Sequence, residues 1–299
     1  MLLGNLIKLY WLKSEEFWRG LESLCYYFLF PIMLFSYISN SELSGTHLMK
    51  LMIVLMLATT LVSFGLVILQ KKYEIDGRVF TSIFQGGIRY NSYIFFALGA
   101  ALYGEEGMKI ISIIAAYMIL YTNILSILAF TIYCPEEDGG NDNKSSATQL
   151  DMFAKNFIMN PLIIASIIGF AFNYFDIEII ASLKKTLDTI ATSAHTVGLL
   201  CVGASLRLFG NFIDKFAVSI ACIVKLIIMP ALTFIMLKLL GIGGVEHAVC
   251  MLYSMLPTAT NSYLLSKQMG GDADVMTSII TISIILSPLT LAMAIYLFG

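Results

Sequence analysis

Long apolar runs follow one another along most of this chain. A helix that spans a bilayer needs roughly 20 mostly apolar residues. Runs that meet this requirement cover approximately residues 20–38, 48–70, 79–103, 109–133, 157–175, 187–206, 214–239, 247–267 and 273–298. They are preceded by Met1–Leu12, which is apolar but too short to cross a bilayer alone. The pattern predicts an all-α integral membrane protein with about nine full spans.

One hydrophilic stretch interrupts this pattern near the middle of the chain. Residues 134–155 combine acidic residues with glycine, asparagine and serine, a composition that is typical of a linker. We therefore expect an N-terminal membrane repeat over residues 1–133, a linker over 134–155 and a C-terminal membrane repeat over 156–299.

The two halves share an ordered series of features, which indicates an internal duplication. The run 79–103 contains Asn91-Ser92-Tyr93, and the run 247–267 contains Asn261-Ser262-Tyr263. In each half a turn with glycine and acidic residues follows, and then an isoleucine-rich run. If Met1–Leu12 counts as a helix, the matching spans are the fourth and the ninth. They are then an odd number of helices apart, so the copies face opposite ways, as in the inverted repeats of many transporters.

Composition agrees with a membrane protein and excludes several other classes. Hydrophobic residues make up 58% of the chain and charged residues 13%, about half the charged share of a soluble domain. The net charge of −2 argues against a nucleic-acid partner. The five cysteines form no metal-binding or disulfide pattern and are interpreted as small buried hydrophobes. No cofactor is expected.

Basic residues predict the orientation in the membrane, because cytoplasmic loops collect lysine and arginine. Eleven of the sixteen basic residues outside the spans lie on the side of the linker. The other side receives Lys50, Lys109, Lys184, Lys185 and Lys238. We therefore expect a multi-pass protein of the cytoplasmic (inner) membrane, with the linker in the cytoplasm and the C-terminus outside.

Polar residues inside the run 79–103 mark a first candidate site, since polar groups in hydrocarbon are costly. Gln85, Arg89, Asn91 and Ser92 lie there, and the glycine pair 86–87 is expected to break the helix just before them. Arg89 keeps its charge and matches a carboxylate in two-point contact. It could equally extend to the membrane surface or pair with an internal acid.

A second polar segment lies in the matching run 247–267. Pro257 should break or kink the helix, because proline removes a backbone donor and clashes with the preceding turn. Thr258, Thr260 and Asn261 follow directly. They could hold a ligand, or they could satisfy the backbone groups that the kink frees.

Two further residues are candidates for coupling or support. Lys225 lies within an apolar run before Pro230, where it could neutralise an acid, occupy a cation position or extend to the surface. His195 could relay protons, although a histidine satisfied by helix packing is the simpler interpretation.

Taken in order, these segments resemble the auxin efflux carrier family, which includes plant carriers and bacterial permeases for malate and malonate. The resemblance rests on segments 85–91, 160–163, 202–206, 225–230 and 257–261, with Gly270-Gly271-Asp272 after them. It implies ten helices in two inverted five-helix repeats, with the fourth and ninth broken and crossing at the membrane centre. The sodium/proton antiporter NhaA and the bile-acid symporters share this plan.

The resemblance also implies a mechanism, and two departures accompany it. The first two helices of each repeat would form a scaffold, the other three would move as an elevator, and the substrates would be organic anions. Here the chain starts within what would be the last turns of the first helix, so either the start codon is assigned too late or this helix is shortened, and its topology stays open. In addition, the run 79–103 has no proline to match Pro257, so its break would have to come from Gly86 and Gly87 or be milder.

We therefore expect a secondary transporter for a small organic anion, of the mono- or dicarboxylate class, and not an enzyme. Arg89 would balance the anion's charge, and Asn91, Ser92, Pro257, Thr258, Thr260 and Asn261 would line its site. No GxxxxGK[ST] loop for ATP exists, so a proton or a sodium gradient would supply the energy, and a homodimer is conceivable. The alternatives are a sodium-coupled symporter of the bile-acid type, a membrane sensor, and an intramembrane aspartyl protease using Asp272 and Asp274.

Overall fold

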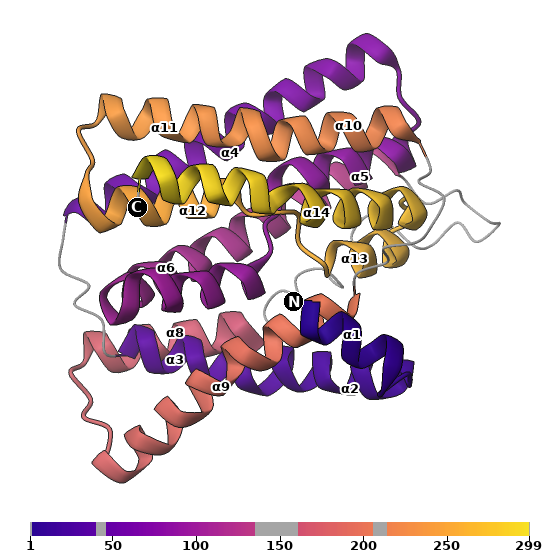
Figure 1. Ribbon diagram of the computed structural model, residues 1–299. Helices are drawn as coiled ribbons and strands as arrows, with labels where there is room; N and C mark the ends of the chain where they lie inside the picture. The colour runs from indigo at the N-terminus through magenta and orange to yellow at the C-terminus, as the bar shows by residue number, and fades with distance from the viewer. Residues whose placement is uncertain (1, 40–45, 135–160, 206–213, 299) are drawn as a thin grey trace, which may run out of the picture. The chain divides into compact units, whose positions relative to one another are not determined.

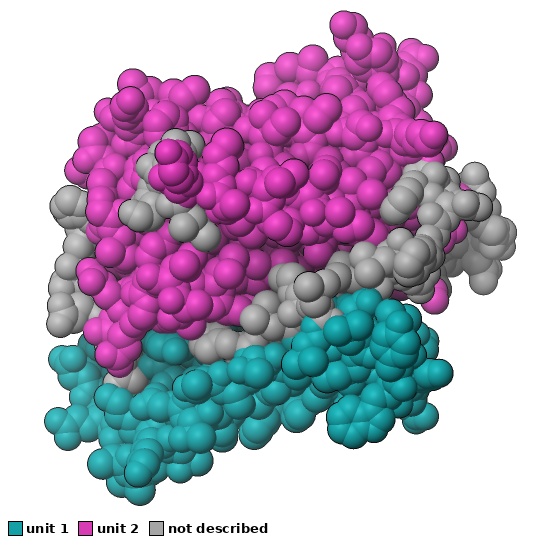
Figure 2. Space-filling model, in the orientation of Figure 1, with its two compact units in different colours: residues 1–43, 136–204 teal, residues 44–135, 205–299 magenta. Residues whose placement is uncertain are grey.

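The computed structural model describes residues 2–39, 46–134, 161–205 and 214–298, apart from a few side chains within the helices. All regular structure in these ranges is helical. The chain forms two compact units, residues 1–43 with 136–204 and residues 44–135 with 205–299 (Figure 2). The expected linker, 134–155, lies outside the described residues except for Cys134, so its boundaries and those of the two repeats stay predictions.

The first unit contains α1 (Leu2–Tyr10), α2 (Glu15–Leu24), a π-helical turn η1 (Cys25–Leu29), α3 (Phe30–Ser39), α8 (Pro161–Tyr174) and α9 (Ala181–Ser205). Helices α3 and α8 lie side by side (Figure 1), with the ring of Phe35 edge-on to Phe172 at 5.1 Å between centroids. Gly4 of α1 lies so close to α9 that an added Cβ would be 2.2 Å from the carbonyl oxygen of Leu200.

The second unit contains the helices α4 (Thr46–Tyr73), α5 (Gly77–Ile88) and α6 (Ser92–Tyr133), then α10 (Lys215–Ile223), the π-helical turn η2 (Val224–Ile228) and α11 (Met229–Leu239), and finally α12 (Gly244–Met255), α13 (Ser262–Gln268) and α14 (Ala273–Phe298). Figure 1 shows α10 and α11 as one nearly continuous rod through η2. Helix α6 is two helices joined at Gly104, whose φ of 57° is readily adopted only by glycine.

Two of the expected spans are broken, and one of the breaks lies where the sequence predicts it. In the run 247–267, α12 ends before Pro257, and Leu256 is extended, because a residue that precedes proline is disfavoured in the α conformation. In the run 79–103 the chain is extended from Arg89 to Asn91. The side chain of Asn91 accepts a hydrogen bond from the backbone N–H of Ile94 and so caps α6.

The break does not lie at Gly86 and Gly87, and that expectation was wrong. Both glycines are inside α5, which continues to Ile88. They are needed for close packing: a Cβ on Gly86 would lie 2.8 Å from Cγ2 of Ile279, and one on Gly87 would lie 2.9 Å from Cγ1 of Val224. The glycine pair therefore lets α14 and η2 approach α5.

Both π-helical turns precede a proline by the same spacing. The N–H of Phe30 donates to the carbonyl of Cys25, directly before Pro31, and the N–H of Met229 donates to that of Val224, directly before Pro230. A proline ring clashes with the carbonyl four residues earlier. The wider i−5 turn relieves that clash without ending the helix, which accounts for η1 and η2.

Five helical stretches in the described ranges are long and apolar enough to cross a membrane: Glu15–Ser39, Leu48–Tyr73, Gly77–Tyr133, Lys215–Leu239 and Ala273–Met293. The expected spans 79–103 and 109–133 both fall within the third of these. The expected span 247–267 is absent from the set because it is divided between α12 and α13. The start of the expected span 157–175 lies outside the described residues, which leaves α8 short.

Candidate functional site

The non-helical segments 89–91 and 256–261, both in the second unit, are hydrogen-bonded to each other. We call this region, with the side chains that it brings together, the crossover. The N–H of Asn91 donates to the carbonyl of Pro257 at 2.9 Å. The hydroxyl of Thr258 donates to the carbonyl of Gly86 at 2.8 Å, and the N–H of Thr258 donates to Oγ of Ser283 at 3.2 Å. Backbone groups that each break would leave unpaired in the membrane are thus satisfied by the other segment or by α14.

Arg89 is the buried cation of the crossover. Its side chain is 6% exposed. Nη1 donates to Oε1 of Gln85 at 2.8 Å, and Nη2 donates to Oδ1 of Asn261 at 3.1 Å. Gln85 is in turn held by Ser266, whose Oγ accepts from Nε2 at 3.0 Å. The planar guanidinium is therefore oriented by neutral amides from both segments of the crossover and keeps its full positive charge.

Two buried polar groups of the crossover have no hydrogen-bond partner within the described part of the chain. They are Nδ2 of Asn91, a donor, and Oγ of Ser262, which can donate or accept. The two residues occupy related places, because Asn91 caps α6 and Ser262 begins α13 just after Asn261. Unpaired buried donors are costly, and those of a ligand site are satisfied when the ligand binds.

An aromatic cluster of Tyr90, Phe95 and Tyr253 backs the crossover. The rings of Tyr90 and Tyr253 lie 4.5 Å apart between centroids, and Phe95 contacts both edge-on. All three are almost fully buried. Nζ of Lys225 lies 5.5 Å from the centroid of the Tyr253 ring. Sequence reasoning singled out Lys225 but not the tyrosine that it contacts.

The other expected site residues have different surroundings. Ser92 is half-buried at the first position of α6, and Thr260 is half-buried within the break before α13. Asn261 is exposed in part, although its side chain reaches Arg89. His195 belongs to α9 in the first unit, and its side chain lies outside the described residues, so its expected role stays untested.

Sequence reasoning missed Ser266 and Ser283, which hold Gln85 and Thr258 in place. A signal was available for the first of them. Ser266 follows Ser262 by four residues, so both lie on one face of α13. The signal for Ser283 was weaker, because hydroxyl residues recur along much of α14.

Asp272, the basis of the expected protease alternative, has a structural role. Its Oδ1 accepts from the N–H groups of Asp274 and Val275 and thereby caps α14. Its N–H donates to the carbonyl of Arg78, and its carbonyl accepts from the hydroxyl of Ser82. These bonds fix the turn between α13 and α14 against the start of α5.

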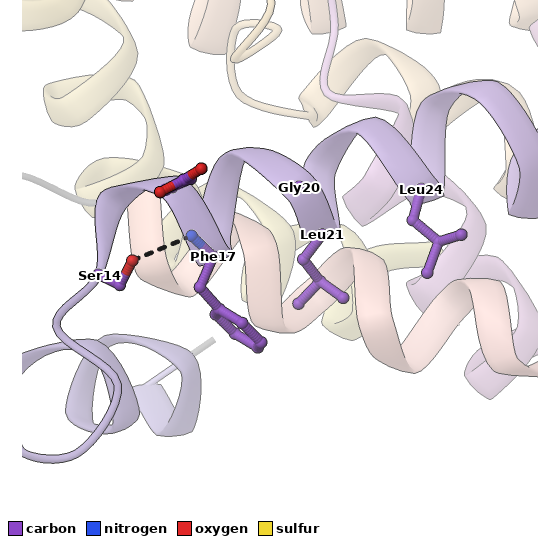
Figure 3. Close-up of a pocket in the computed structure, with 6 residues that line it drawn as sticks. Ser14, Phe17, Gly20, Leu21 and Leu24 are labelled. Carbon is purple, nitrogen blue, oxygen red and sulfur yellow. Dashed lines mark hydrogen bonds between the residues drawn. The ribbon is translucent and has the colours of Figure 1, made fainter.

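A shallow pocket lies along one face of α2 in the first unit. It is lined by Ser14, Glu16, Phe17, Gly20, Leu21 and Leu24 (Figure 3). The hydroxyl of Ser14 caps the helix by accepting from the N–H of Phe17. Most of the lining is apolar and exposed, as expected for a helix face that meets lipid.

The polar groups of the crossover include one buried cation and one amide donor without a partner among the described residues. Asn91, which carries the amide donor, caps the N-terminus of α6, where the helix dipole favours negative charge, and Arg89 precedes it by two residues. Among the described residues, no cluster of three or more histidine, cysteine, aspartate or glutamate side chains could hold a metal ion. The arrangement can therefore bind a small anion by two-point contact and a flanking hydrogen bond.

Comparison with known proteins gives a consistent result over nearly the whole chain. Residues 1–295 match the family described as "Membrane transport protein". The chain is 24% identical over 301 residues to an uncharacterized transporter of Methanocaldococcus jannaschii, covering 98% of this chain and 94% of that protein. It is 27% identical over 165 residues to a Rhizobium meliloti protein named "Putative malonate transporter", covering 53% of this chain and 50% of that protein.

These matches agree with the resemblance to the auxin efflux carriers and permeases. The family and both relatives are described as transporters and not as enzymes. The apolar helices long enough to cross a membrane fit the same class. The chain therefore belongs to the membrane transport protein family.

Proposed function

We propose that this transporter moves a small organic anion, a mono- or dicarboxylate, and binds it at the crossover. The observation that carries the proposal is the buried guanidinium of Arg89, held by amides of both broken segments. A guanidinium can bind a carboxylate in a two-point contact. The unpaired Nδ2 of Asn91 would donate to the same anion.

The relatives support the chemical class of this substrate without fixing its identity. The name of the Rhizobium meliloti protein refers to malonate, which carries two carboxylates. That protein is a distant and partial match, so malonate serves as the first probe. Arg89 and Asn91 are suited to any small carboxylate, because they would contact the carboxylate group alone.

The proposed mechanism is an elevator in which the unit that contains the crossover moves. The division of the chain into units supports it. Each unit takes helices from both sides of the central linker, and the first unit holds α1 to α3 together with α8 and α9. These are the elements that the family resemblance assigns to the scaffold. The second unit holds the broken helices and would carry the anion.

The repeated Asn-Ser-Tyr supports an inverted duplication within this mechanism. Asn91 and Asn261 each precede the second half of a broken helix. The same tripeptide thus occupies the same structural position in each half. We place the transporter in the cytoplasmic membrane with the linker inside, on the distribution of basic residues.

The proposal is tested by binding, measured as thermal stabilisation of purified protein against a panel of carboxylates that includes malonate. A ligand at about 100 times its Kd adds about 2.7 kcal/mol to the stability of the folded state. Arg89→Ala should weaken binding by roughly ten- to a hundredfold, because a hydrogen bond to a charged group contributes about 1.5–3 kcal/mol.

Arg78→Ala is the matched control for this experiment. Arg78 lies on the same helix, α5, but its side chain is exposed at the first turn. This variant should bind the stabilising carboxylate as the wild type does. If Arg89→Ala keeps full affinity, or if no panel member stabilises the wild type, the proposed anion site is wrong.

A further inference from the structure

Lys225 is fully buried, and the proposed anion site does not use its ionisable amine. Its side chain has an exposure of 0%. Within the described residues Nζ has no hydrogen-bond partner and no acidic partner. Nζ lies over the ring of Tyr253, 5.5 Å from its centroid. Oη of Tyr253 is itself buried without a hydrogen-bond partner.

The backbone at Lys225 is irregular, because the residue lies in the π-helical turn η2. Because the N–H of Met229 donates to Val224, the carbonyl of Lys225 loses the donor that an α-helix would supply. Pro230, the next residue, has no N–H to replace it. π-helical turns of this kind are frequent at functional sites. An amine, a carbonyl and a tyrosine hydroxyl are therefore concentrated at one buried place.

Among the described residues, no charged group forms an ion pair with Lys225. The elements that pack against η2 are α5, α10, α11, α12 and α14. Most of their charged or titratable side chains lie in the first or last turn of a helix: Arg78, Lys215, Lys238, Glu246, His247, Asp274 and Tyr296. The others are Tyr253 and the buried thiols of Cys222 and Cys250. Arg89, which follows α5, adds a further positive charge.

An amine in this position is stable as the neutral form, whereas an ammonium needs a nearby anion. Taking an unpaired charge out of water costs several kcal/mol. Lysine can avoid this cost by releasing its proton, which arginine cannot do. Arg89 is thus a permanent charge and Lys225 an exchangeable one.

Lys225 is also connected to the crossover through buried contacts. Tyr253 packs on Tyr90, which lies between Arg89 and Asn91 in the sequence. Val224, the neighbour of Lys225, packs against Gly87 in the last turn of α5. An anion held at the crossover would act on Lys225 through a region with little water, where charges interact over longer distances.

We propose that Lys225 is the proton-binding site of a proton-coupled anion carrier. The inference rests on the proposed function. When the anion enters the crossover, the amine of Lys225 takes one proton from the aqueous phase and becomes an ammonium. When the anion leaves on the other side of the membrane, the ammonium releases that proton. One proton is thus carried with each anion, and a proton gradient drives uptake.

The test measures proton uptake when purified protein in weakly buffered detergent solution binds malonate, using a soluble pH indicator. Thermal stabilisation by malonate is recorded on the same samples. Wild-type protein should take up one proton for each malonate bound. Lys225→Arg keeps a permanent charge, so it should bind malonate and take up no proton. Lys225→Met should also lose proton uptake, with weaker binding.

Lys238→Met is the matched control, because Lys238 lies on the adjoining helix α11 and is exposed. It should behave as the wild type in both measurements. If Lys225→Arg binds malonate and still takes up a proton, or if the wild type binds malonate without proton uptake, Lys225 is not the coupling site and the anion site stands. If the wild type binds neither malonate nor any other carboxylate of the panel, both proposals are overturned.

Discussion

Asn91 combines two functions in one side chain, and substitution can separate them. Its Oδ1 caps α6 through the N–H of Ile94, and its Nδ2 has no partner in the described residues. The oxygen thus has a structural role, and the nitrogen is available to a ligand. Asparagine is an effective cap, but so is aspartate.

We therefore expect Asn91→Asp to fold and to lose anion binding. The aspartate keeps the capping oxygen, while it removes the amide donor and adds a negative charge beside the bound carboxylate. Asn91→Ala should instead lower the free energy of unfolding by about 1 kcal/mol through loss of the cap. Thermal stability with and without malonate measures both effects. An Asn91→Asp variant that binds malonate normally would show that Nδ2 does not contact the anion.

Residue type alone indicated several residues of the crossover. Arg89, Asn91 and Thr258 stood out because they are polar within apolar runs, and the structure places all three at the crossover. The partners of Arg89 could not be derived in the same way. Its contact with Asn261 spans 172 residues, and only the crossing of two breaks brings these side chains together.

At the scale of the element, the glycine pair of α5 shows why a helix-weakening residue need not break a helix. Gly86 and Gly87 lower helix propensity, yet both remain helical because α14 and η2 pack against them. Tertiary packing thus outweighed local propensity. The extended segment follows at Arg89, where the hydrogen bond from Asn91 to Pro257 replaces helical bonds.

Gly87→Ala should lower the free energy of unfolding by about 1–3 kcal/mol, because the new methyl group would be 2.9 Å from Cγ1 of Val224, a side chain with little rotamer freedom. Combining it with Val224→Ala should recover part of the loss, since the second change removes the clashing atom. Thermal unfolding of the wild type, the two single variants and the double variant in the same detergent measures both effects.

Gly65→Ala is the control for this cycle, because a Cβ on Gly65 meets no atom within 4 Å. It should leave stability unchanged or raise it slightly, as alanine favours a helix. Equal effects at Gly65 and Gly87 would mean that the close packing of α5 on η2 does not limit stability.

At the scale of the whole molecule, hydrophobic pattern predicted the helical membrane class, and the positions of the breaks followed in part. Pro257 indicated one break, because proline interrupts a helix. The other depends on long-range pairing and could not be located from the sequence. The hydrophobic pattern could not predict the division into two units either, because each unit joins segments from both sides of the linker.

The central claim is that Arg89 serves a carrier that moves carboxylates, and counterflow in proteoliposomes tests it most directly. Vesicles loaded with unlabelled malonate should accumulate labelled malonate when they contain the wild type or Arg78→Ala. Vesicles with Arg89→Ala should accumulate none above protein-free vesicles, although that variant inserts and unfolds at a similar temperature. Counterflow at the wild-type rate by Arg89→Ala would contradict the account.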